Sequence, residues 1–266
     1  MKETVRVIAI LTVLYCCQAA NVFNKVLVDD PAALCLDGTH AAYYVHQADK
    51  TKFVLSFEGG GWCGNSGGVS QTLESCFQRS KGALGSSSSY PATISASEGI
   101  LSDNQQNLFR NWTIVHLKYC DGTGHQGYRK DPIDYKATKI YFRGHNATMG
   151  QLNSIDKNFK LFSEATEIVV TGQSAGGLAT FLWTNYIAKR APKTAKVWSL
   201  PDSGIFLDQP SFVSQKNEYK QGFINFMSLA NTEVDPPTEE CVKANPNEKW
   251  KCLFGEYLHQ DRKSVV

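Results

Sequence analysis

The sequence lacks several features that would place it in a common class at once. No apolar run reaches the roughly 18 residues that a membrane-spanning helix needs. The 27 basic and 25 acidic residues nearly balance, and the basic ones form no long run, which argues against a nucleic-acid partner. There is no CxxC pair and the histidines are scattered, which argues against a zinc site. We therefore expect no metal and no other cofactor.

The features that are present are those of a globular protein. The chain has 266 residues, of which 42% are hydrophobic and 20% charged. A length of about 250 residues is routine for a single α/β domain. No internal repeat and no interdomain linker is visible, so we expect one domain over residues 21–266.

The first twenty residues have the order of a secretory signal peptide. Lys2 and Arg6 are basic, residues 7–15 are apolar, and small residues ending at Ala20 suit cleavage. A buried N-terminal helix or a short anchor is the alternative. The complete basic–apolar–small order favours a signal peptide over residues 1–20, and hence a protein that is secreted or held in the endomembrane lumen.

The cysteines agree with a secreted chain, because six remain after the predicted cleavage point and an even number indicates disulfides. Short separations favour Cys63–Cys76 and Cys241–Cys252, which leaves Cys35–Cys120. Proximity alone does not settle the pairing. Two triplets, Asn111-Trp112-Thr113 and Asn146-Ala147-Thr148, are candidate glycosylation acceptors.

Apolar runs typical of strands alternate with a helical pattern. The strand-like runs cover residues 41–46, 52–57, 112–118, 167–171 and 196–200, and the helical spacing covers residues 178–190. This order predicts an α/β sheet with right-handed crossovers. The serine-containing segment 82–97 is predicted to be an exposed loop.

Residues 172–176 read Gly-Gln-Ser-Ala-Gly, directly after an apolar strand and before the predicted helix. GxSxG in a strand–turn–helix setting is typical of a nucleophile elbow, in which Ser174 is exposed in a strained turn. Side chains at 172 and 176 would collide with neighbouring backbone. The helix start also supplies N–H groups and a positive dipole end. An ordinary glycine-rich turn is the alternative, and the context favours a nucleophile.

A second glycine-rich segment, residues 58–63, directly follows the strand at 52–57. In serine esterases a loop at this place donates backbone N–H groups to the oxyanion, and the N–H of the residue after the nucleophile, here Ala175, completes the hole. A flexible loop is the simpler interpretation. A phosphate-binding loop is the rival, but neither glycine segment has the required GK[ST] ending or GxGxxG spacing.

Several segments together resemble the pectin acetylesterase family, which also contains the animal Wnt deacylase Notum. They run in family order and cover residues 36–38, 57–63, 111–112, 119–122, 141–144, 172–179 and 202–208. The resemblance implies a secreted serine carboxylesterase with an α/β-hydrolase-like fold, in which helices flank a mostly parallel central sheet. It also implies Ser174 as the nucleophile and the N–H groups of Gly61, Trp62 and Ala175 as the oxyanion hole.

The family triad runs Ser, Asp, His, and the segments that carry its Asp and His have no match here. The resemblance therefore implies a domain that is incomplete at its C-terminus. Alternatively, Asp202 and His259 substitute as acid and base. We favour truncation, because geometry and not mere presence defines a triad. His116 alternates with apolar strand residues and is predicted to be structural, whereas His125, in a glycine-rich loop, is a candidate for lining the pocket.

Three hypotheses about function follow. The first is an esterase that removes O-acetyl groups from a polysaccharide such as pectin, or a longer acyl group from a protein. The second is a catalytically inactive protein that keeps a carbohydrate-binding or acyl-binding cleft. The third is a truncated chain that does not fold stably, because an open sheet edge and an uncovered core would remain. We expect the protein to be a monomer.

Overall fold

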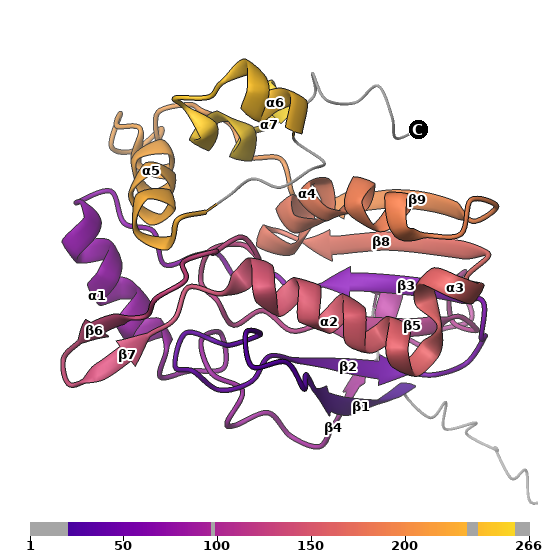
Figure 1. The fold of residues 1–266 in the computed structure, drawn as a ribbon. Coiled ribbons are helices and arrows are strands. Elements are labelled where there is room, and N and C mark those ends of the chain that lie inside the picture. The colour runs from indigo at the N-terminus through magenta and orange to yellow at the C-terminus, as the bar shows by residue number, and fades with distance from the viewer. Residues whose placement is uncertain (1–20, 97–98, 233–238, 259–266) are drawn as a thin grey trace, which may run out of the picture.

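The computed structural model describes residues 21–96, 99–232 and 239–258. Its centre is a seven-stranded sheet with the strand order β4-β1-β2-β5-β3-β8-β9 (Figure 1). The strands of this sheet are β1 (Asn21–Leu27), β2 (Ala42–His46), β3 (Lys52–Phe57), β4 (Thr93–Ala96), β5 (Thr113–Leu117), β8 (Glu167–Gln173) and β9 (Lys196–Asp202). The predicted signal peptide, residues 1–20, lies outside the described residues.

The sheet has a parallel part and an antiparallel part. Strands β5, β3, β8 and β9 run parallel to one another. Strand β2 pairs antiparallel with β5 and with β1, and β4 pairs antiparallel with β1. The carboxyl ends of the parallel strands meet at one edge, which is where open α/β sheets bind their ligands. A small hairpin, β6 (Ile133–Tyr135) and β7 (Thr138–Ile140), stands apart from this sheet.

Helices cover one face of the sheet and gather at its carboxyl edge. Figure 1 shows α2 and α3 in front of the strands, and α1 and α5 beyond the ends of β3 and β8. The helices are α1 (Val69–Arg79), α2 (Gly144–Phe159), α3 (Leu161–Glu164), α4 (Ala175–Arg190), α5 (Glu218–Ala230), α6 (Glu239–Ala244) and α7 (Gly255–Leu258), with 3-10 turns η1 (Gly99–Leu101) and η3 (Lys249–Leu253). None of the described helices combines the length and apolar character needed to cross a membrane.

Two apolar clusters lie on opposite faces of the sheet because side chains alternate along each strand. In β3, Phe53, Leu55 and Phe57 face the larger cluster, which contains Trp183 of α4. Val54 faces a smaller cluster on the other side. Strand β8 is apolar on both faces, since Ile168 to Val170 are at most 2% exposed, as a strand inside a parallel sheet must be. The expected α/β-hydrolase-like sheet with flanking helices is confirmed.

The segment predicted to be an exposed loop, residues 82–97, is exposed only in part: within its described residues, 82–96, eight of fifteen positions are exposed, whereas residues 85–87 and 90 are buried. Its residues 93–96 form strand β4, which pairs with β1, and neither strand was predicted. Ser86 and Ser87 are buried. Ser87 satisfies its polar groups internally, because its Oγ donates to His40 O (2.6 Å) and its N–H donates to Thr39 Oγ1 (3.0 Å). Ser87 can therefore be buried, since its hydroxyl and its N–H both have hydrogen-bond partners in the protein.

The described residues form three disulfides, and these confirm the pairing that the short separations favoured. They are Cys35–Cys120, Cys63–Cys76 and Cys241–Cys252. The second fixes the end of the glycine-rich loop to α1. The first joins segments 85 residues apart, at the end of the sheet where the glycine-rich loop lies.

Candidate active site

Ser174 occupies the turn between β8 and α4, in the predicted strand–turn–helix setting. Its backbone has φ 57° and ψ −119°, a conformation that residues other than glycine rarely adopt. The side chain is half-buried. Such a turn lifts a serine side chain out of the sheet and toward the carboxyl ends of the parallel strands.

Close backbone packing explains the two glycines of the turn. A Cβ at Gly172 would lie 2.4 Å from Gly176 O, and a Cβ at Gly176 would lie 2.1 Å from Phe57 O. No side chain fits at these distances. The turn is therefore pressed against the end of β3, from which the glycine-rich loop begins, and the predicted collision at positions 172 and 176 is present.

The glycine-rich loop offers unused N–H groups beside Ser174. Within the described residues, no acceptor binds the backbone N–H groups of residues 59–62 or that of Ala175 at the start of α4. Ala175 is in the first helical turn, where N–H groups have no partner inside the helix. A Cβ on Gly59 would lie 3.4 Å from Ser174 Cβ, so the loop and the serine are in contact. An oxyanion hole requires such free donors.

A groove of about 740 Å³ opens over Ser174. Its described lining comprises residues 56–60, 99–101, 116, 171–174 and 202. Of the predicted site residues, Ser174 and Asp202 are in this lining, and Gly61, Trp62 and Ala175 are not. The Trp62 side chain packs instead against Phe206 and Phe223, with ring centroids 4.8 and 4.5 Å apart.

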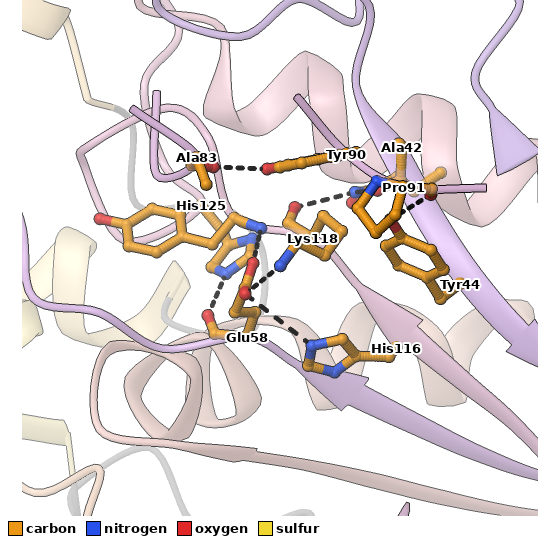
Figure 2. A network of polar contacts seen from close by, with 11 residues as sticks. Ala42, Tyr44, Glu58, Ala83, Tyr90, Pro91, His116, Lys118 and His125 are labelled. Atoms are coloured by element: carbon orange, nitrogen blue, oxygen red, sulfur yellow. Dashed lines mark hydrogen bonds and ion pairs between the residues drawn. The ribbon is translucent and has the colours of Figure 1, made fainter. Parts of the chain in front are cut away.

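The two histidines differ in their relation to the groove. His116, predicted to be structural, is half-buried on β5 and also lines the groove. Burial lowers its pKa to about 4. His125, the candidate for the pocket, is 2% exposed and does not line the groove. Its Nε2 donates to Glu58 O (3.0 Å), and burial lowers its pKa. Figure 2 shows both rings around Glu58.

Asp202 lies next to Ser174, and the hydrogen bond between the two residues is made by the backbone oxygen of Asp202. The exposed carboxylate accepts a hydrogen bond from Ser203 Oγ (2.8 Å). His259, its proposed partner, lies outside the described residues. Across the described ranges, no histidine is hydrogen-bonded to Ser174 Oγ, and no three His, Cys, Asp or Glu side chains gather as metal ligands would.

A half-buried ionic network beside the loop was missed by the sequence reasoning. The Glu58 carboxylate accepts from Lys118 Nζ and from the Tyr119 N–H (2.8 Å), and His116 Nε2 lies 4.0 Å away (Figure 2). Glu58 directly follows β3 and Lys118 directly follows β5, and these strands are parallel neighbours. Opposite charges at the carboxyl ends of two adjacent strands predict an ion pair. The sequence did not reveal this pair because it does not show that β3 and β5 are neighbours.

The two candidate glycosylation sites differ in exposure. Asn111 is exposed just before β5. Asn146 is half-buried in the first turn of α2, its Oδ1 is shielded from solvent, and Thr148 of the same triplet is fully buried. The structure therefore favours Asn111 over Asn146 as an acceptor.

A parallel sheet with a serine in a strained turn between a central strand and a helix defines an α/β-hydrolase-like protein. The structure of the Wnt deacylase Notum from Drosophila matches this chain with a TM-score of 0.78, covering 91% of this chain and 69% of that one at 24% identity. This similarity establishes the fold.

The chain belongs to the pectinacetylesterase family, whose sequence model matches residues 16–265. Pectin acetylesterase 5 of Arabidopsis thaliana is 31% identical over 88% of this chain and 52% of its own length. Palmitoleoyl-protein carboxylesterase NOTUM of Drosophila melanogaster is 27% identical over 87% of this chain and 34% of its own length. The chain thus spans about half the length, or less, of these curated relatives.

Proposed function

We propose that this protein acts on carboxylic esters, with Ser174 as the nucleophile and the N–H groups of Gly61, Trp62 and Ala175 as the oxyanion hole. The observation that carries the proposal is the strained turn that holds Ser174 against a loop whose N–H groups are unused. The names of the relatives, pectin acetylesterase and palmitoleoyl-protein carboxylesterase, support the same reaction class.

In this reaction Ser174 Oγ attacks the ester carbonyl and its proton passes to a base. The carbonyl oxygen becomes an oxyanion, which accepts hydrogen bonds from the free N–H groups. Each such donor contributes about 3 kcal/mol to stabilising the transition state. The alcohol then leaves, and water releases the acid from the acyl-serine.

The reaction needs a base that accepts the proton of Ser174 Oγ. Asp202 and His259 are the acid and base that the sequence offers within this chain. A serine hydroxyl without a base is a weak nucleophile. If neither residue serves, the remaining rate comes from the oxyanion hole alone and lies several orders of magnitude below that of a complete triad.

Hydrolysis of p-nitrophenyl acetate by the full chain tests the reaction class. We expect Ser174→Ala to lose hydrolysis above the uncatalysed rate. Ser95→Ala is the control, because Ser95 is exposed on β4 and does not line the groove. Equal rates for the wild type and Ser174→Ala would remove Ser174 from the reaction.

Within this class we propose an O-acetyl ester on a polysaccharide as the substrate. The groove beside Ser174 is rich in polar side chains that suit sugar hydroxyls: Ser56, Glu58, His116, Thr171, Gln173 and Asp202. Acetate release from acetylated pectin, compared with release of palmitoleate from an acylated peptide, tests this choice. Faster release of palmitoleate would favour the protein deacylase instead.

The alternative function is a catalytically inactive protein that binds carbohydrate or acyl groups. It is favoured by the lack of a histidine bonded to Ser174 Oγ in the described part of the chain. A fluorophosphonate probe distinguishes the two, because it labels an activated serine. Pectin binding without labelling of Ser174 supports the binding protein, and strong labelling of Ser174 supports the esterase.

We also propose that the protein is secreted. Three disulfides fit an oxidising compartment, and residues 1–20 have the signal-peptide pattern. Expression of the full chain in a secretory host, followed by N-terminal sequencing, should give a product in the medium that begins at Asn21. An uncleaved intracellular product would contradict this.

A further inference from the structure

The glycine-rich loop is held by its carbonyl groups. Three side chains donate hydrogen bonds to them: His125 Nε2 to Glu58 O (3.0 Å), Arg79 Nη2 to Gly60 O (2.9 Å) and Tyr119 Oη to Gly61 O (2.7 Å). A loop with no side chains of its own at residues 59–61 is thus fixed from outside. All three donors come from segments that are distant in the sequence, at the end of α1 and in the loop after β5.

Each carbonyl contact also orients an N–H group. A trans peptide is planar, so the C=O of one residue and the N–H of the next point in opposite directions. All peptides described here are trans. Arg79, by holding Gly60 O, therefore fixes the direction of the Gly61 N–H. Tyr119, by holding Gly61 O, fixes the direction of the Trp62 N–H.

These two N–H groups are the loop donors assigned to the oxyanion hole in the proposed function. No described acceptor binds either of them. They are therefore turned away from the buried side chains and left available, which is the arrangement that stabilises an oxyanion without reorganisation during the reaction.

The side chains that hold the loop are themselves fixed. The Tyr119 ring is fully buried, it stacks on His125 with centroids 4.7 Å apart, and the Arg79 guanidinium lies 4.9 Å from its centroid. The Gly124 N–H donates to Tyr119 Oη (2.8 Å). That hydroxyl therefore accepts one hydrogen bond and has its single proton free for Gly61 O.

We propose that Tyr119, Arg79 and His125 are positioning residues for the oxyanion hole, which they set by holding the carbonyls of Glu58, Gly60 and Gly61. This inference rests on the proposed function for its catalytic consequence. The orientation of the Gly61 and Trp62 N–H groups is a structural property of the loop, and it can be measured without an activity assay.

Tyr119→Phe tests the proposal, because it removes one hydroxyl and keeps the stacked ring. The matched control is Tyr44→Phe. Tyr44 is also buried, and its hydroxyl donates to a backbone carbonyl at the same distance, 2.7 Å, but that carbonyl belongs to Pro91 outside the loop. We expect Tyr119→Phe to lower kcat for p-nitrophenyl acetate about 10- to 100-fold at unchanged KM, since it misdirects one oxyanion donor. Tyr44→Phe should stay within about twofold of the wild type.

Backbone 15N relaxation provides a second measurement that needs no activity. We expect order parameters of about 0.85 for Gly61 and Trp62 in the wild type and in Tyr44→Phe, and below about 0.6 in Tyr119→Phe. Unchanged order parameters in Tyr119→Phe, an unchanged kcat, or an equal kcat loss in both variants overturns the proposal. A wild type without Ser174-dependent hydrolysis contradicts the proposed function, and the order parameters then decide the positioning inference alone.

Discussion

The backbone N–H of Ser174 donates a hydrogen bond to the carbonyl oxygen of Asp202 over 2.9 Å. This bond joins the strained turn to the end of the neighbouring parallel strand, in continuation of the β8–β9 ladder. A non-glycine residue in such a conformation costs about 1–3 kcal/mol, and one hydrogen bond returns about 1 kcal/mol of that. The contact of Asp202 with Ser174 is thus made by its backbone, whereas its carboxylate binds Ser203.

Replacing Gly59 by alanine should destabilise the protein by about 3 kcal/mol, at the upper end of overpacking costs. The new Cβ would lie 2.1 Å from Gln173 O, between the glycine-rich loop and the Ser174 turn, and its two nearest atoms, the O and C of Gln173, belong to the backbone. Gly82→Ala is the control, because its Cβ would meet nothing closer than Arg79 O at 3.9 Å. Urea unfolding measures both. Similar stabilities for the two variants would show that the loop can move away from Ser174 without loss.

Local patterns in the sequence were sufficient for the parallel half of the sheet. The run at 167–171 is buried on both faces, and GxSxG follows it, so strand, turn and helix were predicted together. Strand β1 was hidden because Asn21, Asn24 and Lys25 interrupt its apolar residues. Strand β4 was hidden because four residues of mixed polarity, Thr93 to Ala96, acquire their order from pairing with β1.

The roles of the histidines were harder to predict because they depend on contacts between distant segments. Alternation along β5 places His116 on one face but does not say whether that face is covered. The environment of His125 depends on Tyr119 and on Glu58, which is 67 residues away along the chain. Strand order and loop packing, which single-sequence patterns do not contain, decide both positions.

Removing the Cys35–Cys120 disulfide should cost more stability than removing Cys241–Cys252. The first closes a segment of 85 residues and the second one of 11, and the chain-entropy estimate gives the longer loop an advantage of about 2 kcal/mol. All four cysteines are buried, so their alanine substitutions create comparable cavities. Urea unfolding of the two double-alanine variants measures the difference. Equal losses would mean that the unfolded chain is not constrained by the longer loop.

The stability of the protein should fall as the pH decreases from about 6.5 to 4. Burial lowers the pKa of His116 to about 4 in the folded state, so the unfolded chain binds this proton first as the pH falls. The free energy of unfolding then decreases by up to about 1.4 kcal/mol per pH unit and per histidine. His125, whose pKa burial also lowers, adds a change of the same sign.

His116→Gln isolates the contribution of one histidine to this slope. Urea unfolding at pH 7.5, 6.0 and 4.5 should show a smaller loss of stability in the variant, while the contribution of His125 remains. At pH 7.5 both histidines are largely neutral in the folded and the unfolded state, so the measurement at this pH gives the cost of the substitution itself. Parallel curves for the wild type and His116→Gln over this range would assign the pH dependence to other groups.

Strand β9 should be the part of the described surface most prone to self-association. Among the described strands it pairs with β8 alone. The Lys196 N–H and the Asp202 carbonyl oxygen form hydrogen bonds on the side of β9 that faces β8. Main-chain groups alternate in direction along a strand, so those of the odd-numbered residues, 197, 199 and 201, point to the open edge. Pro201 removes one donor there, which is a common protection of edge strands. The even-numbered side chains nevertheless expose 37% of Trp198 and 46% of Leu200.

The double substitution Trp198→Lys and Leu200→Lys should reduce concentration-dependent aggregation, because charge on an edge strand opposes pairing with another chain. Leu108→Lys is the control, since Leu108 is 86% exposed but lies in a loop without a free edge. Light scattering measured as a function of protein concentration compares the aggregation of the two variants, and the reduction is expressed per added lysine. A reduction by Leu108→Lys as large as that per substitution in β9 would show that added charge alone acts, and the open edge of β9 would then have no special part in association.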